Sequence, residues 1–119
     1  MTIQADGVPD QGHLAYVNLD PRVGRERSGN RPCVILTSSG YHAKTSYMVI
    51  CPITTNMTPY PFKVVLPAGL PIGGAILVDQ IKSVDREARG CRVVGVVPES
   101  VMADIRGLLV ALLGLGGGR

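Results

Sequence analysis

The sequence predicts a small, mainly β (α+β) fold: a barrel or half-barrel capped by one amphipathic C-terminal helix. Short β-type runs separated by turn signals fill most of the chain, and their short, irregular spacing favours an all-β sheet or small barrel over βαβ units. One segment with helical periodicity follows them near the C-terminus. A chain of 119 residues fits one domain and leaves no room for a second.

Six segments are predicted to be strands. Residues 13–19 alternate between apolar and polar side chains, as a half-buried strand does. Residues 32–37 are apolar and β-branched and suit a buried strand, and residues 47–53 form another, which Pro52 interrupts. The remaining three are residues 62–66, 75–84 and 91–97. The middle of the chain shows no helical period.

The C-terminal helix is predicted to open at Pro98 and to end near Gly114. Proline suits the first turn of a helix, and Glu99 is placed favourably against the helix macrodipole. The apolar stripe consists of Val101, Ile105, Leu108, Leu109 and Leu112. Because such a stripe needs a surface to lie on, the helix is expected to cap the sheet.

Composition and charge exclude several classes of protein. An apolar fraction of 45% excludes wholesale disorder. The net charge of +3 does not by itself indicate nucleic-acid binding, although the basic residues are mostly arginine, whose planar fork matches phosphate. With no Trp and one Phe, base-stacking platforms are poorly supplied. The polar N-terminus lacks a secretory pattern and no apolar stretch approaches the ~20 residues that span a membrane, so a cytoplasmic protein is expected.

The cysteines and histidines do not form a reactive or metal-binding pattern. Cys33, Cys51 and Cys91 lie in apolar, strand-like surroundings without a CxxC spacing, and they are predicted to be buried, inert thiols. His13 and His42 make no ligand spacing with them and have no evident nucleophile, which argues against zinc and against a Cys–His hydrolase. No phosphate-binding or dinucleotide fingerprint is present, so neither a metal nor another cofactor is expected.

Two loops carry the polar chemistry. Residues 20–30 are rich in Arg and Gly, and four arginines against Asp20 and Glu26 give residues 20–31 a charge of +2. Residues 54–61 are rich in Thr and Pro. A long Arg/Gly loop is costly to order, so it is expected to bind a partner, the alternative being a solvated connection.

Polar groups near strand ends permit one kind of reaction. RNA cleavage by an internal 2′-hydroxyl needs a base for the 2′-proton, a cation for the charge on phosphate oxygens and an acid for the leaving 5′-oxygen, and no metal. The residues that could supply these roles are Glu26, Arg31, Thr54, Thr55, Asp79, Gln80, Lys82, Arg86 and Arg89. The residue types alone permit this chemistry without selecting it.

A series of short motifs runs through nearly the whole chain. They are GHLAYVNLDPRVG from residue 12, ERSGNRPCVIL at 26–36, PITT at 52–55, YPF at 60–62, VDQIKSV at 78–84, REARG at 86–90 and VPE at 97–99. In this order and spacing the sequence resembles the MazF/PemK/Kid family of toxin endoribonucleases from type II toxin–antitoxin systems, and most of all its MazF branch.

The resemblance implies a fold, an activity and partners. The fold would be a strongly bent antiparallel sheet related to SH3-like barrels, in a single domain of residues 1–119 with a core at 12–113 and flexible ends at 1–11 and 114–119. The activity would be metal-independent cleavage of single-stranded RNA at short sequence motifs, leaving 2′,3′-cyclic phosphate and 5′-hydroxyl ends. The partners would be a second copy in a homodimer and a cognate MazE-like antitoxin whose extended tail occupies the RNA groove.

The resemblance also assigns roles to residues. Arg31 would stabilise the transition state, Thr54 would bind the scissile phosphate, and Glu26 would be the base or would fix Arg31. Asp79 matches a base proposed in the Kid branch, but the arginine and histidine that accompany it there are Leu77 and Arg25 here, which weakens that role. The residues expected to contact RNA or to support the dimer are Arg22, Arg25, Arg27, Asn30, Thr55, Gln80, Lys82, Arg86 and Arg89.

Alternatives to these assignments stay open. Asp79 could be a structural hydrogen-bond acceptor, Arg86 and Arg89 could form a solvated face, and Thr54 could simply end a strand. At the level of function, a toxin of the same kind of fold poisons gyrase and catalyses nothing, acting through its C-terminal helix. A basic small barrel that binds RNA without cutting it is a third interpretation.

Overall fold

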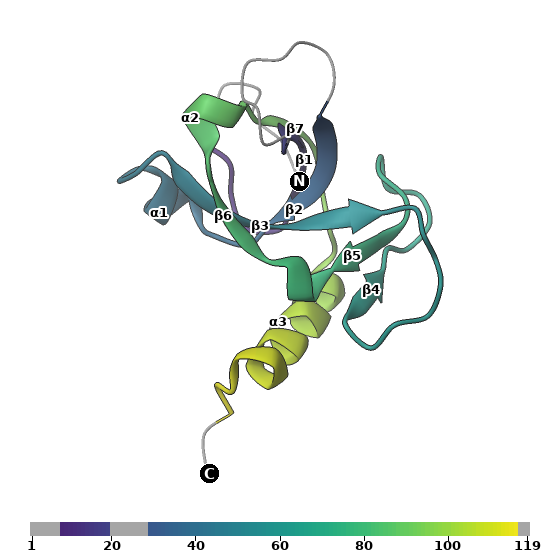
Figure 1. The fold of residues 1–119 in the computed structure, drawn as a ribbon. Helices are drawn as coiled ribbons and strands as arrows, with labels where there is room; N and C mark the ends of the chain where they lie inside the picture. Colours follow the sequence, from purple (N-terminus) through teal and green to yellow (C-terminus); the bar gives the residue numbers. More distant parts are fainter. Residues whose placement is uncertain (1–7, 20–28, 117–119) are drawn as a thin grey trace.

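The computed structural model describes residues 8–19 and 29–116 and shows a seven-stranded antiparallel sheet with a C-terminal helix (Figure 1). The strands are β1 (His13–Asn18), β2 (Asn30–Ile35), β3 (Tyr47–Thr54), β4 (Lys63–Val65), β5 (Ala75–Leu77), β6 (Lys82–Asp85) and β7 (Arg92–Val96). The helical elements are α1 (Ser39–His42), η1 (Val78–Gln80), α2 (Arg86–Arg89) and α3 (Glu99–Leu113). The strand order β4-β5-β3-β2-β1-β7, with β6 on β3, confirms the predicted antiparallel half-barrel, and the sheet does not close into a full barrel.

β3 holds the sheet together because it pairs with three other strands. β2 lies along one edge, and on the other edge β6 pairs with residues 47–50 and β5 pairs with residues 53–54. Pro52 falls between the β6 and β5 segments of that edge, where neither strand pairs with it. Proline has no N–H to give to a ladder, so it is tolerated at this gap. The strand therefore runs through Pro52 to Thr54 and is not interrupted there.

The sheet buries side chains on both faces. The strands β7, β1, β2, β3 and β6 form a curved surface (Figure 1), and an inner cluster packs on one face of it. Its members are Ala15, Val17, Cys33, Ile35, Met48, Ile50 and Val84. On the opposite face an outer cluster packs against α3 and includes Leu14, Val34, Cys51, Ile76 and Ile105. Because side chains alternate along a strand, neighbours such as Leu14 and Ala15 enter different clusters and both are fully buried.

Helix α3 follows the prediction closely. Pro98 is its N-cap, one residue before the first turn, and Gly114 ends it in the left-handed conformation. Val101, Met102 and Ile105 are buried against the sheet, and the half-buried Leu108 and Leu109 pack against the outer cluster. Only the C-terminal end of the helix extends beyond the sheet (Figure 1).

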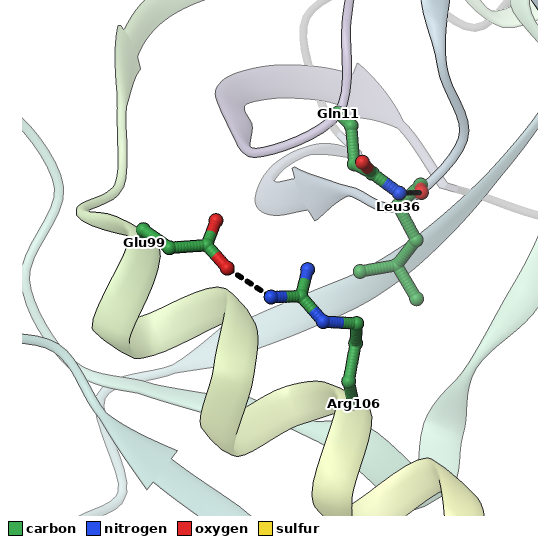
Figure 2. Close-up of polar contacts among 4 residues, drawn as sticks. All are labelled: Gln11, Leu36, Glu99 and Arg106. Carbon is green, nitrogen blue, oxygen red and sulfur yellow. Dashed lines mark hydrogen bonds and ion pairs between the residues drawn. The ribbon is translucent and has the colours of Figure 1, made fainter.

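Two polar contacts lie close to the start of this helix. Figure 2 shows the Arg106 guanidinium reaching back two turns to pair with the exposed Glu99 carboxylate. Nearby, Gln11 Nε2 donates to the carbonyl of Leu36 at 2.9 Å and so ties the segment before β1 to the end of β2.

The structure differs from the prediction at residues 75–84. The expected single strand is divided into β5, the η1 turn and β6, and both strands pair with β3, at its two ends. The amide of Val78 donates to the carbonyl of Phe62 at 2.9 Å and thereby joins this turn to the segment before β4. Apolar residues continue on both sides of Asp79 and Gln80, so periodicity alone does not reveal the break.

The single-turn helices α1 and α2 are also additions to the prediction. Ser38 and Asp85 are their N-caps, each accepting a backbone N–H of the first turn. Four residues are too few to show a helical period, and the capping residues are the only local signal. Within the part of the chain that the structure describes, no helix is long and apolar enough to cross a membrane.

Two glycines allow close approaches that the fold needs. Gly95 of β7 lies under Pro71, whose Cγ would be 2.6 Å from a Cβ at that position. Gly74 has φ +122° and precedes β5, and a Cβ there would lie 2.3 Å from the carbonyl oxygen of Thr54. Any larger residue at position 74 would push against the end of β3.

Gly74→Ala should therefore destabilise the protein by roughly 2–4 kcal/mol, because it combines backbone strain with a steric clash. Gly69→Ala keeps the positive φ of +92° but meets nothing within 4 Å, so it should cost about 1 kcal/mol. Gly73→Ala has neither problem and should change stability by less than ~0.5 kcal/mol. Denaturant unfolding of the three variants at one protein concentration measures this ranking, and equal losses at positions 69 and 74 would contradict the clash with Thr54.

Candidate active site

The residues Arg31 and Thr54 lie where β2 and β3 separate. The last ladder pair is Cys33↔Pro52, and the next residue of β2 is Pro32, which has no N–H for further pairing. Continued by one more step of two residues, the same register sets Arg31 opposite Thr54. Opposite residues of an antiparallel pair point to the same face, here the face of the inner cluster. This extended register favours a shared face for the two residues at the point where the ladder between β2 and β3 ends.

The Arg/Gly loop enters and leaves beside Arg31. Its flanking residues Leu19 and Gly29 are joined by an N–H···O bond of 2.9 Å, and Asn30 at the start of β2 pairs with Asn18 of β1. Arg31 and Asn30 are exposed. The other residues predicted in this loop, namely Arg22, Arg25, Glu26 and Arg27, lie outside the described residues.

Thr54 precedes a loop that is held by hydrogen bonds from side chains to its backbone. Its Oγ1 accepts from the amide of Asn56 at 3.0 Å, and Asn56 Oδ1 accepts from the amide of Thr58 at 2.9 Å. The hydroxyl of Thr54 acts only as acceptor in this bond, so its own proton stays available for a phosphate oxygen. Thr55, the neighbouring candidate, is exposed.

Two further side chains hold the same loop, and the sequence reasoning did not include them. Lys63 Nζ donates to the carbonyls of Asn56 and Thr58 at 2.6 and 2.7 Å. The Tyr60 hydroxyl donates to Asp79 Oδ2 at 2.5 Å. This hydrogen bond to Asp79, together with the charge of that carboxylate, raises the pKa of Tyr60. Tyr60 belongs to the YPF motif, whereas no pattern in the sequence singles out Lys63.

The remaining predicted RNA contacts divide into two kinds. Gln80 and Lys82 are exposed, on η1 and on β6. Arg86 is partly buried, and its Nη2 donates to the carbonyls of His42 and Thr45 at 3.0 and 2.9 Å. Arg89 is also partly buried, and its Nη1 lies 3.5 Å from the carbonyl oxygen of Asn18. Both arginines tie α2 to other elements, which speaks against a merely solvated face.

The structure confirms the prediction of unreactive thiols. Cys33 and Cys51 are buried, and burial raises the pKa of each to about 12. Cys91 is half-buried, and burial raises its pKa as well. A nucleophilic cysteine needs the thiolate, which these surroundings disfavour.

The ring nitrogens of both histidines are within hydrogen-bonding distance of neighbouring protein groups. His42 is buried, with Nδ1 2.6 Å from the carbonyl oxygen of Pro9 and Nε2 2.6 Å from Thr37 Oγ1. His13 Nδ1 accepts from the amide of Asp10 at 2.9 Å. Among residues 8–19 and 29–116, no group of three or more His, Cys, Asp or Glu is arranged to hold a metal ion.

A family model and individual protein sequences both match this chain over most of its length. A model of the PemK-like, MazF-like toxin family of type II toxin–antitoxin systems matches residues 10–113. The endoribonuclease toxin MazF of Escherichia coli K12 is 39% identical over 107 residues, which cover 90% of this chain and 96% of that protein. The endoribonuclease PemK of Escherichia coli is 32% identical over 87% of this chain and 81% of its own length.

Solved structures agree with the sequence relatives. A crystal structure of MazF from Deinococcus radiodurans superposes with a TM-score of 0.82 at 40% identity and covers 92% of this chain and 99% of that one. A MazE–MazF crystal structure from the same organism superposes with a TM-score of 0.81 at 38% identity, covering 92% and 98% of the two chains. With a family model matching nearly its whole length, the chain belongs to the PemK-like, MazF-like toxin family of type II toxin–antitoxin systems.

Proposed function

We propose that this chain cuts single-stranded RNA at short sequence motifs by attack of an internal 2′-hydroxyl, without a metal ion. As a member of this family with named endoribonuclease relatives, it is an endoribonuclease. The finer proposal is supported by the register of β2 and β3, which ends at Cys33↔Pro52 and, extended by two residues, would set Arg31 opposite Thr54. A guanidinium and a hydroxyl at one rim can hold one phosphate between them.

The reaction follows from what these groups can donate. A base takes the 2′-proton, the 2′-oxygen bonds to phosphorus, and the bond to the 5′-oxygen breaks as that oxygen takes up a proton. This leaves a 2′,3′-cyclic phosphate and a 5′-hydroxyl. Arg31 stabilises the negative charge that develops on the phosphate oxygens, and Thr54 donates a hydrogen bond to one of them. Glu26 is the proposed base or the group that orients Arg31.

The RNA would extend from this rim over exposed polar groups. Asn30 lies beside Arg31, Thr55 lies beside Thr54, and Gln80 and Lys82 continue along η1 and β6. Arg22, Arg25 and Arg27 add positive charge to the loop between β1 and β2. Arg86 and Arg89 are proposed to support this surface, because their donors hold α2 in place.

A cognate antitoxin is proposed as the protein partner in the cytoplasm. Support comes from MazE–MazF structures of Deinococcus radiodurans, in which a chain of the same fold is found with an antitoxin. An antitoxin tail that lies along the RNA surface would block Arg31 and Thr54 directly.

A homodimer is proposed because several apolar side chains are exposed on the single chain. Val110 and Leu113 of α3 are 41% and 53% exposed, and Val65 of β4 is 61% exposed. A groove of about 500 Å³ between β4 and α3 lies beside them, lined in part by Val65, Ala103 and Leu108. A second chain would bury this surface, which a monomer leaves in water.

The products test the reaction. Incubated with a long natural RNA in EDTA, the purified protein should cut at a short recurring motif and leave 2′,3′-cyclic phosphate and 5′-hydroxyl ends, because the nucleophile is the RNA's own 2′-oxygen. A 2′-deoxy nucleotide on the 5′ side of the cut bond should block cleavage at that site. End mapping by sequencing reads both results, and RNA that stays intact at high protein concentration would reject the proposal.

Arg31→Ala should lower the cleavage rate by about 10²–10³, since it removes a contact to charge that develops in the transition state. Lys44→Ala removes an exposed positive charge from the turn after α1 and serves as the matched control. The cleavage rate is measured under single-turnover conditions, and circular dichroism checks that each variant is folded. A loss within about threefold would reject Arg31 as catalytic, and toxicity that persists in Arg31→Ala would favour gyrase poisoning.

Sedimentation at micromolar concentration should show a species of twice the chain's mass. Leu113→Lys should shift it toward the monomer, and lysine suits the end of a helix, so α3 itself should not be weakened. Val8→Lys, at a similarly exposed residue 47% accessible to solvent, is the control. A wild-type chain that sediments only as a monomer would contradict the dimer.

A further inference from the structure

The loop between β3 and β4 is held by side chains. Residues 55–62 belong to no strand or helix and connect Thr54 to Lys63, and residues 55–61 of this connection are called the 55–61 loop. Three side chains fix this loop from within or from its ends: Thr54, Asn56 and Lys63 all bond to its backbone. A fifth hydrogen bond, from Tyr60 to Asp79, joins the loop to η1.

Lys63 closes the loop at two points. Its ammonium group binds the carbonyls of Asn56 and Thr58, which lie seven and five residues before it. Both contacts, at 2.6 and 2.7 Å, are short hydrogen bonds from a charged donor, the stronger kind. Since Asn56 also donates its amide to Thr54 Oγ1, the lysine acts on the same peptide segment that orients the Thr54 hydroxyl.

Asp79 closes the loop at a third point. One oxygen of its carboxylate accepts the Tyr60 hydroxyl, across 19 residues of chain. Asp79 sits on η1, the turn between the two strands that pair with β3, so the bond fixes the loop against the sheet. The hydrogen bond from the phenol occupies one acceptor site of the carboxylate and fixes its orientation toward the loop.

We propose that Lys63 and Asp79 are positioning residues, which hold the 55–61 loop in the shape that presents Thr54 and Thr55 to the RNA and that selects the cleaved motif. The catalytic part of this proposal rests on the proposed function, because it presupposes that the chain cuts RNA. Asp79 then acts through Tyr60 and is not the general base.

Kinetics separate positioning from base catalysis. Tyr60→Phe and Asp79→Ala should raise KM by a similar factor, about 5–10-fold, with kcat within about threefold. Asp79→Asn should do less than Asp79→Ala, because its amide oxygen still accepts from the phenol. If Asp79→Asn instead loses kcat by ~10² or more while Tyr60→Phe behaves as wild type, Asp79 is the base and the proposal is wrong.

The selection of the motif is the second readout. Lys63→Met keeps the length of the side chain and removes its donors, so it should broaden the set of cleaved sites in a random RNA pool. Lys63→Arg, which still donates to both carbonyls, should restore part of the selectivity. Lys44→Met is the control and should cut the wild-type sites. An unchanged site distribution in Lys63→Met would overturn the role of Lys63.

Hydrogen exchange tests the proposal without any RNA. Amides of residues 55–61 in Lys63→Met and Tyr60→Phe should exchange about tenfold faster than in the wild type, whereas those of β1 and β2 should not change. Unchanged loop exchange overturns the positioning role even if the protein cuts RNA. Faster loop exchange in a protein that cuts no RNA would confirm the loop anchors and reject the proposed function alone.

Discussion

The pairing of β3 with three strands is the constraint on which the rest of the molecule depends. An eight-residue strand offers two edges, and here one edge serves both β6 and β5 while the other serves β2. Pro52 marks the gap between the two partners because it can give no N–H to either of them. The split edge turns the sheet, and the turned sheet encloses the inner cluster on one side while the other side receives α3.

The candidate site is a consequence of the same strand. A second proline, Pro32, stands where the ladder between β2 and β3 ends, and the next residues along that register are Arg31 and Thr54. A guanidinium and a hydroxyl thus follow the last ladder pair on their two strands. The loop that follows Thr54 lacks strand pairing, so its shape depends on Lys63 and on the bond between Tyr60 and Asp79.

Much of the fold can be predicted from the sequence because it depends on local pattern. The apolar runs around residues 13–19 and 32–37 and the stripe of α3 have periods that differ between strand and helix. The division of 75–84 could not be predicted in this way, since it arises from which part of β3 each half pairs with. Arg31, Thr54 and Asp79 were singled out through family motifs. Lys63 was not, because its partners are backbone carbonyls, which every residue carries.

Pro71 resting on Gly95 has a consequence for how the sheet opens. β4 and β7 stand at opposite ends of the hydrogen-bonded strand order, yet the connection after β4 touches β7 at this point. The two ends of the sheet therefore meet through van der Waals contact between a rigid ring and a bare backbone. Separating them breaks no ladder hydrogen bonds, so local unfolding should begin at this seam while β1, β2 and β3 remain paired.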